Sequence, residues 1–248
     1  MSADGASPIP GPPAAISFDF WNTLVAEPGG KMAALRREAV IRVLLEHEVE
    51  LEEGVLDAHL AAAQALQDAA WKRTEAFSPA QAARHVADSI EGLGAGGKEL
   101  IEEAMMNAGA AAEVQLTPNV PETVAALAAG GIQLGIVCDV GLTGSPHLRG
   151  FLDAAGVLRH FRGWAFSDEV GHFKPSPEIF RHMLGQFELG EAAVVWHVGD
   201  LRRTDVAGAR GSGIVPIRYR GMDDDDSDAA EADLVIDDLA DLVPLALG

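Results

Sequence analysis

Several polar residues follow directly on short apolar runs, where the chain would leave a buried β-strand. They are Asp19, Cys138 with Asp139, and Gly199 with Asp200. The carboxyl ends of parallel strands meet at one edge of a sheet, and ligands bind in the crevice there. We therefore expect these residues to converge on one site, although they are far apart in the sequence. Carboxylates gathered in this way repel one another unless a cation offsets their charge, which favours a metal ion in the site.

The strands that would position these residues are visible as apolar runs suited to a buried parallel sheet. The runs are residues 15–18, 132–137, 194–198, 214–219 and 234–236. Helical patterns lie between them. Ser176 followed by Pro177 is typical of a helix start, and the stretch 120–129 is rich in Ala and Leu and ends at two glycines. Strands that alternate with helices predict an α/β protein with a doubly wound parallel sheet.

One long segment, from about residue 32 to 109, contains helical patterns and no convincing strand. Leu35, Ala39 and Val43 recur at the spacing of one helix face. The glycine-rich residues 94–97 predict a loop within the segment. We therefore expect a helical insert that leaves the sheet after the first strand.

Composition limits the partners of the chain. Of its 248 residues, 48% are hydrophobic and 23% are charged, as in ordinary globular proteins. The formal net charge of −20 would repel nucleic acid and anionic lipid. Cys138 is the only cysteine, so no internal disulfide can form. The first thirteen residues lack the features of a secretory signal, and no apolar run is long enough to cross a membrane. We expect a cytoplasmic monomer or homodimer that binds neither nucleic acid nor membranes.

Four motifs, in order, resemble those of the haloacid dehalogenase-like (HAD) hydrolase superfamily. The first motif, Asp-x-Asp-x-Thr after an apolar strand, is matched by DFWNT at residues 19–23. The second, an apolar strand ending in Ser or Thr, is matched by IVCD, with Cys138 in the hydroxyl position. The third is a lysine before a helix, matched by Lys174 in HFKPSPEIF. The fourth is matched by GDLRRTD, which contains Asp200 and Asp205. Each motif alone is weak, but their shared order argues against a chance match.

This resemblance implies a Rossmann-like core with a helical cap inserted just after the first strand. We therefore expect a disordered tail at residues 1–13, a core formed by 14–27 and 115–248, and a cap at 28–114. Substrate specificity in such proteins lies on the inner face of the cap. Helical periodicity does not show which face that is, so the substrate is expected only to be a small anionic molecule.

The resemblance also implies roles for the motif residues. Asp19 would attack the substrate and form a covalent acyl-type intermediate, which water then hydrolyses. Mg²⁺ would be held by the carboxylates of Asp19 and Asp200 and the backbone carbonyl of Trp21, with Asp205 as a further ligand or a supporting residue. Lys174 would add a fixed positive charge beside the nucleophile or the transferred group.

Three further residues of the motifs are expected near the substrate. Cys138 and the backbone amide of Asp139 would face its oxygens, and Thr23 would form a hydrogen bond near the nucleophile. Because a thiol is a poor hydrogen-bond donor, the alternative for Cys138 is a small buried hydrophobic residue.

Trp21 is the departure from the family pattern with the largest consequence. Phosphatases of this family carry an aspartate there, which protonates the leaving group and then activates water, and an indole can do neither. Trp21 would instead contact the substrate, with Asp139 as a candidate replacement acid. The loss of the acid would slow the reaction least for substrates whose leaving group is stable without a proton.

The same tryptophan leaves two alternatives to a phosphatase. Dehalogenases of the superfamily have an aromatic residue at this position, but they need neither a metal nor the acids at Asp200 and Asp205. We give the acids more weight, which favours a phosphatase. The second alternative is a degenerate member that binds a phosphorylated ligand or a protein partner without turnover.

Other charged residues favour plainer interpretations. Arg36 and Arg37 could reach an anionic substrate, but basic residues on a helix usually face solvent, which is what we expect of both. The acidic run 223–228 is expected to be a solvated loop. His197, inside a strand run, is expected to be packed in the core.

Overall fold

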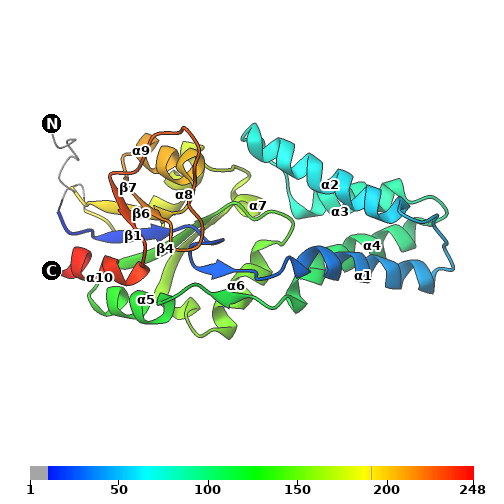
Figure 1. Cartoon of the computed structure of the whole chain (residues 1–248), viewed down its shortest axis with the longest axis horizontal. Helices are drawn as coiled ribbons and strands as arrows, with labels where there is room; N and C mark the ends of the chain where they lie inside the picture. Colours follow the sequence, from blue (N-terminus) through cyan, green and yellow to red (C-terminus); the bar gives the residue numbers. More distant parts are fainter. Residues whose placement is uncertain (1–10, 191) are drawn as a thin grey trace. The chain divides into compact units, whose positions relative to one another are not determined.

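The computed structural model describes residues 11–190 and 192–248 (Figure 1). The tail predicted for residues 1–13 therefore falls largely outside the described residues. The chain divides into two compact units. The first comprises the residues up to Ala26, Leu116–Asp139 and Leu152–Gly248, and the second comprises Glu27–Gln115 and Val140–Phe151. In the described part of the chain, no helix has the length and apolar character needed to span a membrane.

The first unit is built on a six-stranded sheet in which every neighbouring pair is parallel, in the order β5-β4-β1-β6-β7-β8. Its strands are β1 (Ala15–Phe18), β4 (Gln133–Cys138), β5 (Phe161–Phe166), β6 (Val195–Gly199), β7 (Val215–Tyr219) and β8 (Leu234–Ile236). Each of the five predicted runs corresponds to one of these strands, with ends that agree to within one residue. The prediction of an α/β protein with a doubly wound parallel sheet is confirmed.

Strand β5 was not predicted, because its sequence FRGWAF does not form a continuous apolar run. The strand lies at one edge of the sheet, and Arg162 in it is exposed to solvent. An edge strand is only partly covered, so it does not need the apolar pattern of a central parallel strand.

Helices cover both faces of the sheet, with α5 and α10 on one face and α8 and α9 on the other (Figure 1). The helices of this unit are α5 (Val120–Ala129), α7 (Ser167–Val170), α8 (Pro177–Leu184), α9 (Ala207–Gly211) and α10 (Leu242–Leu247). Helix α5 has the bounds that the sequence predicts. In α8 and just beyond it, Ile179, Met183 and Phe187 are all buried, as their four-residue spacing predicts. Met183 packs against the bare backbone of Gly135, where an added Cβ would lie 2.4 Å from its Sδ.

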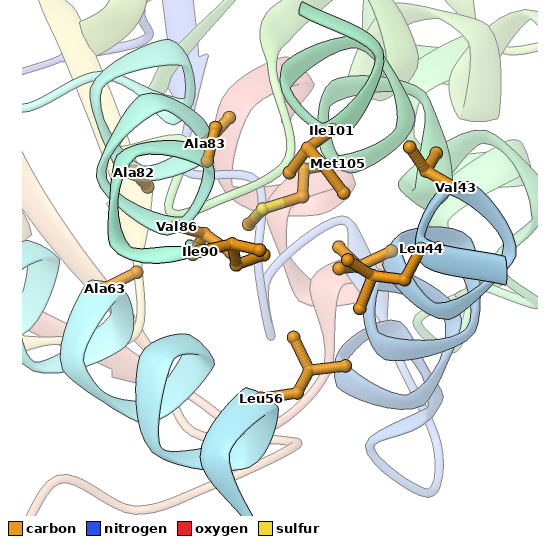
Figure 2. Packing of buried hydrophobic residues seen from close by; sticks show 12 residues of the cluster. Val43, Leu44, Leu56, Ala63, Ala82, Ala83, Val86, Ile90, Ile101 and Met105 are labelled. Atoms are coloured by element: carbon orange, nitrogen blue, oxygen red, sulfur yellow. The ribbon is translucent and has the colours of Figure 1, made fainter. Parts of the chain in front are cut away.

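The second unit consists mainly of helices with their own hydrophobic core (Figure 2). These are α1 (Lys31–Glu46), α2 (Val55–Lys72), α3 (Pro79–Ser89) and α4 (Ala95–Ala108). Helix α6 (Ser145–Ala154) begins in this unit and ends in the first. Figure 2 shows side chains from α1 to α4 that point toward one another, among them Leu44, Leu56, Val86 and Ile101. The unit therefore has a packed interior that is separate from the core around the sheet.

The ends of two helices in this unit test the sequence signals directly. Helix α3 begins with a complete capping box, in which the Ser78 side chain accepts from the backbone N–H of Gln81 and the Gln81 side chain accepts from the backbone of Ser78. The loop predicted at residues 94–97 is wrong beyond Gly94, because α4 begins at Ala95 and includes the next two glycines. Packing of α4 against α1 and α3 overrides the low helix propensity of glycine.

A short pair of strands, β2 (Val25–Ala26) and β3 (Gln115–Leu116), lies where the chain leaves the first unit and returns to it.

Candidate active site

Asp19 is the first residue after β1, in the middle of the parallel sheet. Its backbone N–H donates to the carbonyl of Val198 on β6 at 2.8 Å, which fixes the point at which the chain leaves the sheet. The chain then turns sharply at Asn22, whose φ of 57° lies in the left-handed region that asparagine tolerates better than most residues. Trp21 is half-buried, and its ring packs edge-on against Phe20 with the ring centroids 5.0 Å apart.

The sheet brings three aspartates together although they are far apart in the sequence. Asp19, Asp200 and Asp205 are buried, and each offers a carboxylate oxygen within 4.8 Å of the others. Asp200 directly follows β6, which is paired with β1, so the two residues leave adjacent strands at the same edge. The structure thus gathers the acidic residues of the first and fourth motifs into one cluster.

Lys174 connects two of these aspartates. Its Nζ donates to Asp19 Oδ1 and to Asp205 Oδ1, the second at 2.7 Å, and its side chain is only 3% exposed. The backbone N–H of Lys174 donates to Asp139 Oδ1 at 2.9 Å. Asp139 therefore holds the lysine-bearing loop through its side chain.

Asp205 is held by further donors on both carboxylate oxygens. His197 Nε2 lies 3.0 Å from Oδ1, and the backbone N–H of Leu201 donates to Oδ2 at 3.2 Å. Asp205 lies in a single π-helical turn, Arg202–Val206, a local geometry that is frequent at functional sites. Gly199 allows this close approach, because an added Cβ there would lie 2.3 Å from the Asp205 Cγ.

Burial and mutual repulsion separate the pKa values of the three carboxyl groups. Burial raises the pKa of Asp200 to about 8, and the neighbouring charges of Asp19 and Asp205 add to this rise. Burial also raises the pKa of Asp19 to about 6, against the opposing effect of Lys174. For Asp205, Lys174 and His197 outweigh burial and hold the pKa below its usual range. Burial lowers the pKa of Lys174, but the charges of Asp19 and Asp205 raise it by more. The resulting pKa is well above the ordinary value.

These residues fit a divalent metal ion. Carboxylate oxygens are the preferred donors for Mg²⁺ and Ca²⁺, and three aspartates meet here while Lys174 pairs with only two of them, Asp19 and Asp205. The pKa of Asp200 is raised first by burial and then by the charges of Asp19 and Asp205, which Lys174 offsets only in part. Thr23 Oγ1, in the same motif as Asp19, is buried and has no hydrogen-bond partner among the described residues.

Cys138, the last residue of β4, is completely buried. Burial, and then the nearby charge of Asp19, raise the pKa of its thiol well above the ordinary value, so the thiol stays neutral. This environment suits the small hydrophobic role that we considered as the alternative for Cys138.

The polar role of His197 was missed in the sequence, since it was expected only to be packed in the core. It is buried, but it also bonds to Asp205 and to Ser17. Strand periodicity could have indicated a polar role near the site. Ser17, the partner of His197, lies two residues before Asp19, and alternate residues of a strand share one face.

The prediction that Arg36 faces solvent was also wrong. Arg36 is only 9% exposed, donates to Thr143 Oγ1 at 2.8 Å, and has an Nε without a partner among the described residues. The acidic run 223–228 forms a mostly exposed loop, as expected, and within it the Asp224 side chain also pairs with the buried Arg218 at 2.7 Å. Arg37, by contrast, is exposed, as expected.

Comparison with known proteins places this geometry in a family. The model of haloacid dehalogenase-like hydrolases matches residues 13–213. The chain therefore belongs to this family and is a HAD-superfamily hydrolase, which confirms the resemblance of its four motifs.

The individual relatives include both phosphatases and dehalogenases. A phosphoserine phosphatase of Thermus thermophilus is 36% identical over 132 residues, which is 50% of each protein, so the match spans half the length of this curated relative. A 2-haloacid dehalogenase from Pseudomonas syringae pv. Tomato has a TM-score of 0.68 at 22% identity and covers 94% of this chain and 97% of its own. The magnesium-bound HAD-hydrolase YfnB from Bacillus subtilis has a TM-score of 0.64 at 16% identity, with 95% and 99% covered. At these identities the two structures show the shared fold alone.

Proposed function

We propose that this hydrolase is a Mg²⁺-dependent phosphatase that acts on a small phosphorylated metabolite, with Asp19 as the nucleophile. The observation that carries this proposal is the buried cluster of Asp19, Asp200 and Asp205, in which Lys174 pairs with Asp19 and Asp205. A site with three buried carboxylates and one ammonium group favours another cation, and a reaction that also brings in a phosphate strengthens that preference. The phosphoserine phosphatase relative supports the same reaction class.

Asp19 would attack the phosphorus atom with a carboxylate oxygen, and the bond from phosphorus to the leaving group would break. A water molecule would then attack the same phosphorus, which releases inorganic phosphate and restores the Asp19 carboxylate. Bound Mg²⁺ would shield the repulsion between this carboxylate and the phosphate. Lys174 would keep Asp19 ionised and fixed in orientation, since it already donates to one of the two carboxylate oxygens.

Asp200 and the backbone carbonyl of Trp21 would complete the protein ligands of the metal together with Asp19. Asp205 would act mainly through Lys174, because both of its oxygens already accept hydrogen bonds. The segment 28–114 would serve as the cap that determines which phosphorylated molecule is bound.

The leaving group would be one that departs without a proton. Trp21 occupies the position of the family's acid, and Asp139 is engaged with the backbone of Lys174. Acyl phosphates and activated phosphate esters are therefore the favoured substrates.

Trp21 also favours a second candidate, a 2-haloacid dehalogenase. In that reaction Asp19 would displace halide from carbon, and water would hydrolyse the resulting ester. The dehalogenase from Pseudomonas syringae shares the fold.

One assay separates the two reactions. The protein would be incubated with a panel of acyl phosphates, aryl and alkyl phosphate esters and 2-haloacids, with Mg²⁺ or with a chelator. The proposal predicts phosphate release that the chelator and Asp19→Asn abolish. Halide release that the chelator does not affect would establish the dehalogenase instead.

A further inference from the structure

We propose that His197 is a positioning residue of the active site, which holds Asp205 and thereby keeps the ammonium group of Lys174 on Asp19. The inference rests on the proposed function insofar as it assigns Lys174 a role beside a nucleophilic Asp19. It goes beyond that function because His197 lies behind the carboxylate cluster, inside strand β6.

The contacts of His197 form a continuous chain through the sheet. Ser17 on β1 and His197 on β6 are register partners in the parallel pair. Ser17 Oγ lies 2.9 Å from His197 Nδ1, and His197 Nε2 lies 3.0 Å from Asp205 Oδ1. Asp205 Oδ1 in turn accepts from Lys174 Nζ, which also donates to Asp19. One line of hydrogen bonds thus links the interior of β1 to the residue that follows it.

The surroundings fix the orientation of the imidazole ring. The side chain of His197 has no exposed surface, and the ring packs edge-to-face against Phe180 with the centroids 5.0 Å apart. A buried ring with a partner on each nitrogen has little freedom to rotate.

The chemistry of the partners also fixes which ring nitrogen carries the proton. An ionised Asp205 can only accept hydrogen bonds, so His197 Nε2 must be the donor to it. In the neutral ring Nδ1 is then an acceptor, and the hydroxyl of Ser17 donates to it. The competing acceptor for that hydroxyl, the carbonyl of Trp196, lies farther away at 3.5 Å.

This arrangement divides the charge of Lys174 between two aspartates. The Nε2–H of His197 supplies part of the hydrogen bonding that Asp205 Oδ1 requires. Without it, Asp205 would attract Lys174 more strongly, and the lysine would be drawn away from Asp19. Because the His197 side chain has no exposed surface, we expect the loss to appear in kcat rather than in KM.

The decisive comparison uses His197→Leu and His197→Gln, with His182→Gln on the exposed face of α8 as the control. We expect His197→Leu to lower kcat for phosphate release by about 10- to 100-fold at unchanged KM, as for residues that support a metal site. His197→Gln keeps an Nε2 donor at a similar position and should restore most of that loss. Equal kcat in His197→Leu and the wild type, or a loss in both variants without rescue by glutamine, would overturn the proposal.

Two measurements do not depend on turnover. Nitrogen NMR of the histidine rings in the wild-type protein should show a proton on Nε2 of His197, which faces Asp205, and a proton on Nδ1 alone would overturn the proposal. A crystal structure of His197→Leu should show Lys174 Nζ outside hydrogen-bonding distance of Asp19, and an unchanged contact would contradict it. If His197→Leu does not fold, Ser17→Ala should lower kcat in the same direction. Absence of phosphate release from the wild type would refute the proposed function, while the NMR and crystal results would still decide the role of His197.

Discussion

The Nζ of Lys174 lies 2.7 Å from Asp205 Oδ1, and the two side chains are 3% and 2% exposed. An ion pair this deeply buried is tolerated only when its remaining polar atoms also find partners, as they do here in Asp19 and His197. The same contact commits much of the lysine's charge to Asp205. Asp200 is therefore the carboxylate in the cluster whose charge most needs a further cation.

Metal binding should depend on Asp200. We expect Mg²⁺ to stabilise the wild-type protein by about 2.7 kcal/mol at a concentration 100 times its Kd, because the ion binds only the folded state. Asp200→Asn removes a ligand and should abolish most of this stabilisation, whereas Asp153→Asn, at an exposed position, should leave it unchanged. Calorimetric titration and thermal unfolding measure the effect. Equal Mg²⁺ affinity in both variants would show that the ion binds elsewhere.

In the presence of chelator, stability should fall as the pH rises. The folded-state pKa of Asp200 is raised from its ordinary value of 3.8 to about 8, so the folded protein holds a proton that the unfolded chain has lost. The contribution of this proton to the free energy of unfolding is therefore fully present below about pH 4 and is lost as the pH rises to about 8. Asp19, with a pKa raised to about 6, contributes in the same direction. Urea denaturation at several pH values should show this slope, and Asp200→Asn should flatten it.

Restoring the missing acid should widen the range of leaving groups. Trp21→Asp places a carboxyl group where phosphatases of the family have one, which matters only for substrates whose leaving group needs a proton. We expect the ratio of kcat/KM for an alkyl phosphate to that for an aryl phosphate to rise by up to about 100-fold. Trp21→Asn, which is similar in size but cannot donate an acidic proton, is the control. An equal change in both variants would assign the effect to space rather than to acid catalysis.

Asp224 in the acidic run 223–228, together with Glu231 beyond it, should stabilise the folded protein by pairing with Arg218. Arg218 is 2% exposed at its side chain, and it pairs with Asp224 and Glu231, which are 60% and 40% exposed. Asp224→Asn combined with Glu231→Gln leaves a buried guanidinium group without a charged partner and should cost about 1–3 kcal/mol. Asp226→Asn with Asp228→Asn, at exposed positions of the same run, is the matched control. Urea denaturation of the two double variants would show the difference, and equal stability would contradict the pairing.

The sequence predicted the central strands well, because buried parallel strands need continuous apolar runs. It also predicted which acids meet, since Asp19 and Asp200 leave adjacent strands at the same edge. Edge strand β5 was missed because a strand covered on one side only tolerates the arginine at position 162. The glycines of α4 were read as a loop because tertiary packing is not visible in local propensity.

The polar contacts were harder to predict than the fold. Arg36 was assigned to solvent because a basic residue on a helix usually lies there, and its partner Thr143 is 107 residues away in the sequence. His197 was assigned to packing alone for the same reason. Its register partner Ser17 lies 180 residues away, and only the strand pairing brings the two together.

The most direct test of the account is to look for the covalent intermediate on Asp19. The protein would be mixed with Mg²⁺ and an aryl or acyl phosphate, quenched in acid during turnover, digested and examined by mass spectrometry. We predict one phosphoryl group on the peptide that contains Asp19, and none in Asp19→Asn. Phosphate release without any modification of that peptide, or with the phosphoryl group on another residue, would contradict the assignment of Asp19 as the nucleophile.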